Sequence, residues 1–417
     1  MLNFSKNFSQ IPQLFKLVWN RKRSNALMVT ELVAAFMVLF FVCLAVLHFA
    51  LTYRLPLGYE YENVWNIQAY RKQSAEVEST AITRQSAQRL VSVLRGLPSV
   101  ELASFVSTTP FSFSHRMTSF NRGEKYKTEI SIVTNEFDKT MNLTLTQGRW
   151  FNASDDAYNG TTSTVKVVVI NECAAATFFG KENPIGRDIT YIPGEGIGKD
   201  LERTRYRVVG VISSFRKGSE FDQSGNFMFE RTNILDTTSF LPSQILVKMK
   251  PGTAASYEEE MLKKLEQTAP NWSFQITTLA ADREKKHKNL YFALIPGLTI
   301  AAFLLITVGL GLVGVVWQSV TRRMRELGVR RAFGATRQDI YFFVIGELVA
   351  LTTFAVVFGL FLVAQVPLIP FYEVPTATYA LSICAAVIGM YILTTLCALY
   401  PSRLAGTVQP SDALRYE

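Results

Sequence analysis

The sequence predicts a membrane protein with four transmembrane α-helices and one large α+β domain outside the cytoplasm. Three observations lead to this fold class. The chain contains four long apolar runs, basic residues gather at the ends of these runs, and a long polar stretch with strand and helix patterns separates the first run from the second.

The apolar runs are long enough to cross a bilayer. A hydrocarbon core about 30 Å thick needs about 20 apolar residues in helical form. Four runs meet this length: Ala26–Leu51, Leu290–Trp317, Ile340–Val366 and Tyr379–Leu399. The first run is about twice as long as the apolar core of a signal peptide, and no A-x-A cleavage site follows it. We therefore expect an uncleaved anchor, transmembrane helix 1, at residues 26–52.

Basic residues predict the topology. The N-terminal segment 1–25 has no acidic residue among its cations Lys6, Lys16, Arg21, Lys22 and Arg23. The segment between the second and third runs carries Arg322, Arg323, Arg325, Arg330, Arg331 and Arg337. Cytoplasmic loops are enriched in such residues, so both segments, and the C-terminal tail 402–417, are predicted to be cytoplasmic. This clustering also accounts for much of the net charge of +9, and we expect no nucleic-acid partner.

Residues 53–288 form the predicted extracytoplasmic domain. A strand–helix–strand pattern occurs near its start and again near its end. The segments are Val64–Tyr70, Ile82–Leu94 and Val100–Thr108, then Ser243–Lys250, Ala254–Ala269 and Trp272–Thr278. Between the two patterns, residues 136–235 are rich in turn residues and contain the strand-like runs Val165–Ile170 and Tyr206–Ile212. Two β-α-β units around a β-rich insertion predict one split subdomain and one inserted subdomain.

The basic segment 318–339 has the pattern of a helix, a sharp turn and a second helix. Val320, Met324 and Leu327 follow helical spacing and give an apolar stripe, as in a helix lying on the inner membrane surface. Gly334 can end this helix in the left-handed conformation, and Thr336 with Asp339 forms a capping box. The alternative is a stop-transfer anchor whose arginines bind lipid headgroups, but it leaves the glycines and Glu326 unexplained.

Several separated motifs resemble those of one protein family, and they occur along this chain in the same order as in that family. RMRELGVRRAFGATRQDI, followed by an apolar run with Glu347, is similar to the cytoplasmic motif of the MacB/FtsX superfamily of ABC permeases. LTQGRWFNASDD, VKVVVINECAAATFFGKENPIGRDI and RYRVVGVISSFRKGS resemble its MacB-type periplasmic core, and PSRLAGTVQPSDALRYE resembles its C-terminal signature. The resemblance covers nearly the whole chain.

The resemblance implies an architecture and a set of partners. The periplasmic core would combine a porter-like split part with a sabre-like insertion, and residues 289–401 would form an FtsX-like permease domain. The implied location is a bacterial inner membrane with both termini in the cytoplasm. The implied partners are a cytoplasmic ABC ATPase and a second permease, as a homodimer or heterodimer. A periplasmic adaptor and an outer-membrane channel are partners of MacB itself, and they stay open for this chain.

The resemblance also implies a docking element for the ATPase. Arg330 and Arg331 suit contact with acidic side chains or helix C-termini, and Glu326 could accept a partner's arginine. The expected docking and coupling residues are Arg322, Arg325, Glu326, Gly328, Arg330, Arg331, Gly334, Ala335 and Thr336.

The chain contains no ATP-binding motif. The sequence G-x-x-x-x-G-K-[ST] does not occur, and GEGIGKD at 194–200 lacks both its spacing and its Ser or Thr. MacB carries an ATPase domain ahead of its first span, whereas about 25 residues precede that span here. We expect this chain not to be an enzyme and to bind no cofactor, with ATP and magnesium on a partner chain.

A few residues inside the apolar runs are candidates for other roles. Gly309, Gly311 and Gly314 spell G-x-G-x-x-G within a helix, which favours close helix packing over dinucleotide binding. Glu347 lies about two turns into the third run, where it could face a protein interior or extend to the interface, and both alternatives remain open. The histidines are too isolated to predict a metal site.

Three functional classes fit these features to different degrees. The first is the permease subunit of a type VII-like ABC transporter, which would transmit motion from a separate ATPase to drive export or extraction of a periplasmic or membrane substrate. The second is FtsX-like signalling that regulates a cell-wall hydrolase or senses antimicrobial peptides. The third is an anchored binding protein, which would not need the docking motif. The first is favoured.

Overall fold

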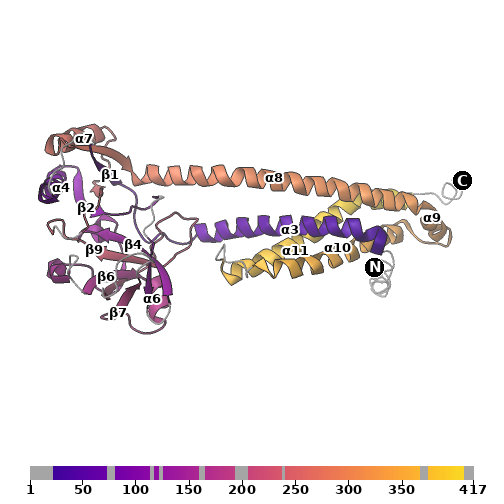
Figure 1. The fold of residues 1–417 in the computed structure, drawn as a ribbon. Coiled ribbons are helices and arrows are strands. Elements are labelled where there is room, and N and C mark those ends of the chain that lie inside the picture. The colour runs from indigo at the N-terminus through magenta and orange to yellow at the C-terminus, as the bar shows by residue number, and fades with distance from the viewer. Residues whose placement is uncertain are drawn as a thin grey trace. The chain divides into compact units, whose positions relative to one another are not determined.

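The computed structural model describes residues 22–72, 80–112, 117–121, 125–158, 165–192, 205–236, 240–366 and 374–407. These residues form two compact units (Figure 1). The helical unit comprises residues 1–51 and 292–417, and the sheet unit comprises residues 52–291.

The helical unit contains the four predicted spans. The long helices are α3 (Lys22–Tyr53), α8 (Leu279–Arg322), α10 (Arg337–Val363) and α11 (Thr376–Thr407), and the short helix α9 (Met324–Ala332) lies between α8 and α10. Each long helix has the length and hydropathy of a membrane span, which confirms the predicted membrane protein. α3 and α8 extend beyond the predicted spans, whereas α10 ends before the predicted Val366.

Close contacts join α3 to its neighbours in the helical unit. A Cβ atom added to Gly359 of α10 would lie 2.4 Å from the Phe36 ring, and one added to Gly389 of α11 would lie 3.0 Å from Leu39. Phe36 is fully buried. Glycine therefore sets the spacing between these helices, since any side chain at 359 would overlap an immobile ring.

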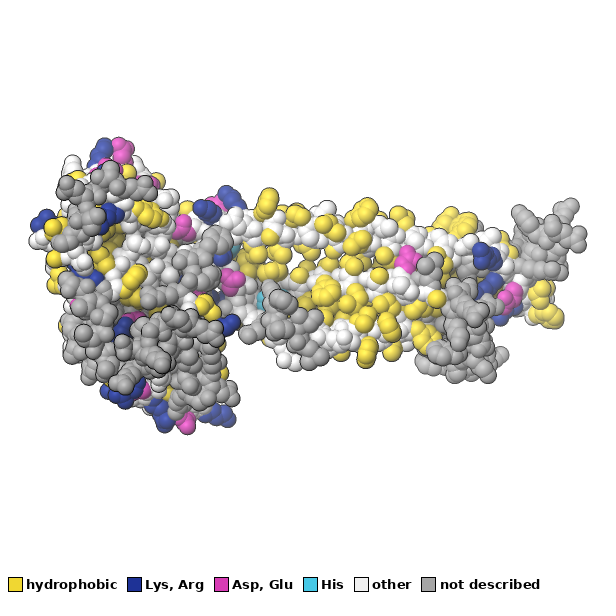
Figure 2. Space-filling model, viewed as in Figure 1, with side chains coloured by type: hydrophobic (Ala, Val, Ile, Leu, Met, Phe, Trp, Pro, Cys, Tyr) yellow, Lys and Arg dark blue, Asp and Glu magenta, His cyan; other side chains and the backbone are white. Residues whose placement is uncertain are grey.

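Apolar side chains are spread over the face of the helical unit that Figure 2 shows. Large side chains on α8 are among the most exposed, with Phe292 at 84%, Leu310 at 69% and Phe303 at 67% exposure. A surface of this kind would be unfavourable in water, and it fits lipid or a neighbouring transmembrane helix.

The split subdomain of the sheet unit has the predicted elements. They are β1 (Val64–Arg71), α4 (Thr80–Arg95), β2 (Val100–Val106), β10 (Gln244–Met249), α7 (Tyr257–Thr268) and β11 (Trp272–Thr278). The strands pair in the order β11-β1-β10-β2, all antiparallel, and α4 packs beside α7. Leu90 and Leu94 of α4 and Met261 and Leu265 of α7 are fully buried against the strands.

The second part of the sheet unit is a closed ring of six strands, in the order β4-β3-β7-β8-β6-β9 and back to β4. Their bounds are β3 (Met117–Asn121), β4 (Lys125–Val133), β6 (Val165–Asn171), β7 (Asp188–Ile192), β8 (Arg205–Ile212) and β9 (Phe227–Arg231). α5 (Phe137–Thr140), β5 (Leu145–Gly148), η1 (Ala153–Tyr158) and α6 (Glu172–Phe179) lie between them in sequence. β3 and β4 precede residue 136, so strand pairing begins the inserted part earlier than the sequence predicted.

Candidate functional site

A break in the helix separates α9 from α8. The first helix predicted within the segment 318–339 is interrupted, because Arg323 lies in a turn between α8, which ends at Arg322, and α9, which begins at Met324. The Arg323 amide still donates to the Val320 carbonyl at 3.0 Å, and the Leu327 amide donates to the Arg323 carbonyl at 3.0 Å. The chain thus changes direction at a single basic residue.

The side chain of that residue pairs with Glu347 of α10. Nη1 of Arg323 donates to both carboxylate oxygens of Glu347, each at 2.8 Å. The side chains are 20% and 12% exposed. Glu347 thus faces a partner of opposite charge within the helical unit, which stabilises an ionised group inside an apolar bundle.

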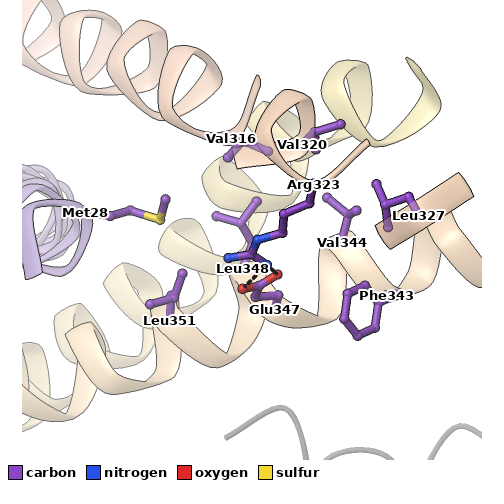
Figure 3. Close-up of a pocket in the computed structure, with 10 residues that line it drawn as sticks. All are labelled: Met28, Val316, Val320, Arg323, Leu327, Phe343, Val344, Glu347, Leu348 and Leu351. Carbon is purple, nitrogen blue, oxygen red and sulfur yellow. Dashed lines mark hydrogen bonds and ion pairs between the residues drawn. The ribbon is translucent and has the colours of Figure 1, made fainter. Parts of the chain in front are cut away.

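Apolar side chains surround the ion pair (Figure 3). They line a cavity of about 30 Å³ together with Arg323 and Glu347: Met28 from α3, Val316 and Val320 from α8, Leu327 from α9, and Phe343, Val344, Leu348 and Leu351 from α10. Three transmembrane helices and α9 therefore meet at one pair of charges. Arg323 is also the residue that joins α9 to α8.

α9 has one buried face and one exposed face. Leu327 is 3% exposed and packs with Val320, Ile340 and Val344, and Gly328 is also buried. On the other side, the side chains of Glu326 and Arg330 are about 40% exposed and pair with each other at 3.2 Å. An exposed pair of this kind contributes less than about 1 kcal/mol. Glu326 and Arg330 can therefore leave this ion pair and bind other groups at little cost in free energy.

The end of α9 and the start of α10 are fixed by local capping, as predicted. Gly334 adopts a left-handed φ of +96°, and the Ala335 amide donates to the Arg330 carbonyl at 3.1 Å, as in a Schellman motif. Thr336 caps α10, with reciprocal bonds between its backbone and side chain and those of Asp339. α9 and α10 are thus joined by a defined turn.

Two family patterns match the chain. The pattern of the MacB-like periplasmic core domain matches residues 33–264, and that of the FtsX-like permease C-terminal domain matches residues 298–410. The chain belongs to the MacB/FtsX family of ABC transporter permeases. The recognised family and the predicted fold class are thereby confirmed.

Individual relatives of this permease are distant. It is 26% identical over 307 residues to YvrN, an uncharacterized ABC transporter permease of Bacillus subtilis (strain 168), an alignment that covers 69% of this chain and 70% of YvrN. It is 25% identical over 308 residues to the macrolide export ATP-binding/permease protein MacB of Chlorobium luteolum, covering 70% of this chain but 43% of that protein. The alignment thus spans less than half the length of this MacB.

A solved structure of the periplasmic region of MacB from Actinobacillus actinomycetemcomitans is similar at 16% identity. It matches 54% of this permease and 92% of that chain, with a TM-score of 0.37.

The structure places most of the predicted docking residues around α9. Arg322, Glu326, Gly334 and Thr336 are exposed, and Ala335 is half-buried against the bundle. Arg330 lies over the ring of Phe343, 4.2 Å from its centroid. Arg325 and Arg331 lie within α9, but their side chains fall outside the described residues. The remaining predicted residue, the buried Gly328, faces the permease rather than solvent.

The three predicted packing glycines of α8 have different surroundings. A Cβ atom on Gly311 would lie 2.1 Å from Oε1 of Glu31 in α3, and one on Gly309 would lie 3.6 Å from the sulfur of Cys397 in α11. Gly314 faces open space. Within one chain, Gly311 and Gly309 therefore contact neighbouring helices, and Gly314 does not.

Sequence reasoning missed some residues of this site. It counted Arg323 only among the cations and did not pair it with Glu347. It also passed over Phe333, which is 90% exposed at the end of α9. An exposed phenylalanine beside basic residues was a usable signal for a contact surface, whereas nothing local in the sequence indicated the pairing of residues that are 24 positions apart.

Proposed function

We propose that this chain is the permease subunit of an ABC transporter in which a separate cytoplasmic ATPase binds α9. ATP-driven motion of that ATPase would pass through the transmembrane helices to the extracytoplasmic sheet unit. The outcome would be export or extraction of a substrate from the periplasm or the inner membrane. The observation that carries the proposal is the two-sided character of α9, whose apolar face is buried and whose charged face is exposed.

The exposed face of α9 suits a protein partner. Phe333 supplies a large apolar side chain, and Glu326 and Arg330 supply charges of both signs beside it. Binding energy at interfaces concentrates in a few aromatic and arginine side chains surrounded by polar ones. We expect the ATPase to offer an apolar socket for Phe333 with an acidic group near Arg330.

The connections of α9 suit the transmission of motion. The capped turn at Gly334 and Thr336 joins it to α10, and the Arg323–Glu347 ion pair joins its other end to the same helix. An element fixed at both ends moves with its neighbour as a rigid body. A push on α9 would therefore move α10 instead of bending the turn.

The assembly would contain two permeases and two ATPase subunits, with both termini of the permease in the cytoplasm. The exposed apolar face of α8, including Gly314, is the surface we assign to the second permease. Disulfide cross-linking of a Gly314→Cys variant in native membranes tests this assignment, because only facing helices bring two such residues within bonding distance. An adaptor and an outer-membrane channel would be further partners if the substrate leaves the cell.

The proposed substrate class follows from the names of the relatives. The MacB relative is named for macrolide export, and a substrate held in the periplasm or membrane would suit this permease as well. The reported relatives are transporter proteins. We therefore do not adopt the signalling alternative.

Co-purification tests the proposal. The tagged permease is purified from native membranes in mild detergent, and the eluate is examined by mass spectrometry and assayed for ATP hydrolysis. We expect an ATPase with a P-loop motif to accompany the wild type and to be lost from a Glu326→Arg variant that still inserts in the membrane. Glu284→Arg, on the exposed side of α8 in the sheet unit, is the matched control. Recovery of the dimer without any ATPase would refute the proposal.

A further inference from the structure

A loop of the sheet unit contacts both of the segments that connect this unit to the membrane spans. The loop covers residues 213–222, between β8 and β9, and we call it the brace loop. The first connection is residues 52–58, after the span in α3. The second connection is residues 279–291, the start of α8. All three segments belong to the sheet unit.

The brace loop holds the first connection through backbone groups. The Arg216 amide donates to the Leu57 carbonyl at 3.0 Å, and Nη1 of Arg216 donates to the Leu55 carbonyl at 2.7 Å. Gly58 has a φ of +87°, and a Cβ atom there would lie 1.5 Å from the Ser214 carbonyl oxygen. Only glycine permits this approach, so the two segments are in direct backbone contact.

A buried guanidinium fixes the shape of the brace loop. Arg216 is 2% exposed and lies among backbone carbonyls. Its Nε donates to the Asp222 carbonyl at 3.0 Å, and its Nη2 donates to the Glu220 and Asp222 carbonyls at 2.5 and 2.6 Å. Buried charged groups require such a complete set of partners. The loop therefore cannot rearrange locally without exposing unsatisfied carbonyl oxygens.

The brace loop holds the second connection through Glu220. The Glu220 carboxylate accepts hydrogen bonds from Nε of Arg283 and pairs with Nε2 of His287 at 2.8 Å, one turn further along α8. Burial raises the pKa of Glu220, but the hydrogen bonds from Arg283, its own backbone and His287 together bring the pKa below its usual value. The carboxylate is thus ionised when it binds α8.

The neighbouring ring touches both connections at once. The Phe221 ring centroid lies 5.4 Å from that of Tyr53 in the first connection. It also lies 5.1 Å from His287 and 6.3 Å from Tyr291 in the second. Edge-to-face and tilted aromatic pairs at these distances are stabilising. In the charged run 282–288, Lys285 and Lys288 are therefore exposed, whereas Arg283 and His287 face the brace loop.

We propose that the brace loop joins the two connections into one rigid junction, with Glu220 as the positioning residue that fixes α8 to the segment after span one. Because both connections are held by the same short loop, the spans at either end would move the sheet unit together and not independently. The functional consequence rests on the proposed transmission of motion from an ATPase, whereas the rigidity of the junction does not.

Distance measurement across the junction tests the proposal. Spin labels are attached at Arg54→Cys and Lys285→Cys, one exposed site in each connection, in a full-length chain whose four cysteines are replaced by serine. Pulsed electron paramagnetic resonance then gives the distance distribution in lipid nanodiscs. We expect one narrow distribution in this background, a broad one in Glu220→Ala, and no change in Glu284→Ala, which removes an exposed ion pair from the same helix.

Two results would overturn the junction. One is a Glu220→Ala distribution as narrow as that of the parent, and the other is a parent distance that changes when the partner ATPase is trapped with ATP and vanadate. If Glu220→Ala does not fold, Glu220→Gln, which keeps the size and removes the charge, takes its place. The first comparison needs no ATPase, so a failure of the proposed function and a failure of the junction give different results.

Discussion

The guanidinium of Arg323 and the carboxylate of Glu347 form a two-oxygen hydrogen-bonded ion pair at the point where α9 leaves α8. Arg323 lies in the turn between α8 and α9, and Glu347 lies in α10, which the chain reaches through α9 and a capped turn. It closes this segment into a loop of fixed geometry, so the position of α9 is set at both of its ends.

Removal of one member of this pair is expected to destabilise the helical unit strongly. Glu347→Gln leaves the Arg323 charge uncompensated among apolar side chains, at a cost of about 3 kcal/mol. Arg323→Met combined with Glu347→Leu removes both charges and should cost less than either single change. Thermal unfolding in detergent, followed by circular dichroism, measures the difference. Glu326→Gln, which breaks the exposed pair on α9, serves as the control and should change stability by less than about 1 kcal/mol. Equal effects of Glu347→Gln and Glu326→Gln would contradict the assignment of the Arg323–Glu347 pair to an apolar environment.

Substitution of the glycine at 359 is expected to separate α10 from α3. Gly359→Ala places a methyl group against the buried Phe36 ring and should cost about 1–3 kcal/mol by overpacking. Gly314→Ala meets open space and should be neutral or slightly stabilising, because alanine favours helices by about 1 kcal/mol. The two variants are compared by thermal unfolding of the monomer isolated in detergent, because Gly314 is assigned above to the interface with the second permease. The described packing would be contradicted if Gly359→Ala unfolded like the wild type while Gly314→Ala was destabilised.

Truncation of Phe333 is expected to weaken ATPase binding without affecting folding. The side chain is 90% exposed, so Phe333→Ala should change unfolding stability by less than about 0.5 kcal/mol. At an interface hot spot the same substitution reduces the free energy of binding by about 2 kcal/mol, which lowers the affinity about 30-fold. Titration of the ATPase onto permease in nanodiscs gives the affinity. Phe361→Ala removes an exposed ring, at 66% exposure, from the end of α10 that lies away from α9, and this variant should bind normally.

Acid is expected to weaken the brace loop through Glu220. Its pKa in the folded protein lies below the ordinary value of 4.5, so folding favours the ionised form. The corresponding stability is complete above about pH 4.5 and is lost as the pH falls through the lower, folded value. Glu220→Gln lacks this contribution at every pH. The difference in unfolding stability between the wild type and Glu220→Gln should therefore be largest near neutral pH and shrink in acid. A difference that grows on acidification would contradict the assignment.

The elements were predictable where the sequence pattern is local. The strand Trp272–Thr278 was predicted with the bounds it has in the structure, since it alternates in character and follows the turn residues Pro270 and Asn271. The cap of α10 at Thr336 and the left-handed Gly334 were also predictable, because capping depends on residues within one turn of each other.

The remaining features depend on partners far apart in the chain. Glu220 and His287 are 67 positions apart, and Gly359 meets Phe36 only after the spans have packed. The closure of the ring between β4 and β9 is likewise a long-range pairing, so composition indicated strands but not their order. Resemblance to a family supplied the general architecture, whereas the ion pairs that fix α9 and α8 required the three-dimensional arrangement.

The docking role of α9 is tested most directly by cross-linking in living cells. A photoreactive phenylalanine analogue is incorporated at position 333, and after irradiation the adducts are identified by mass spectrometry. The account predicts an adduct between the permease and a P-loop ATPase from position 333 and none from position 292, which is similarly exposed but lies on α8. An ATPase adduct at 292 and not at 333, or no ATPase adduct at 333 under conditions in which the two proteins co-purify, would contradict it.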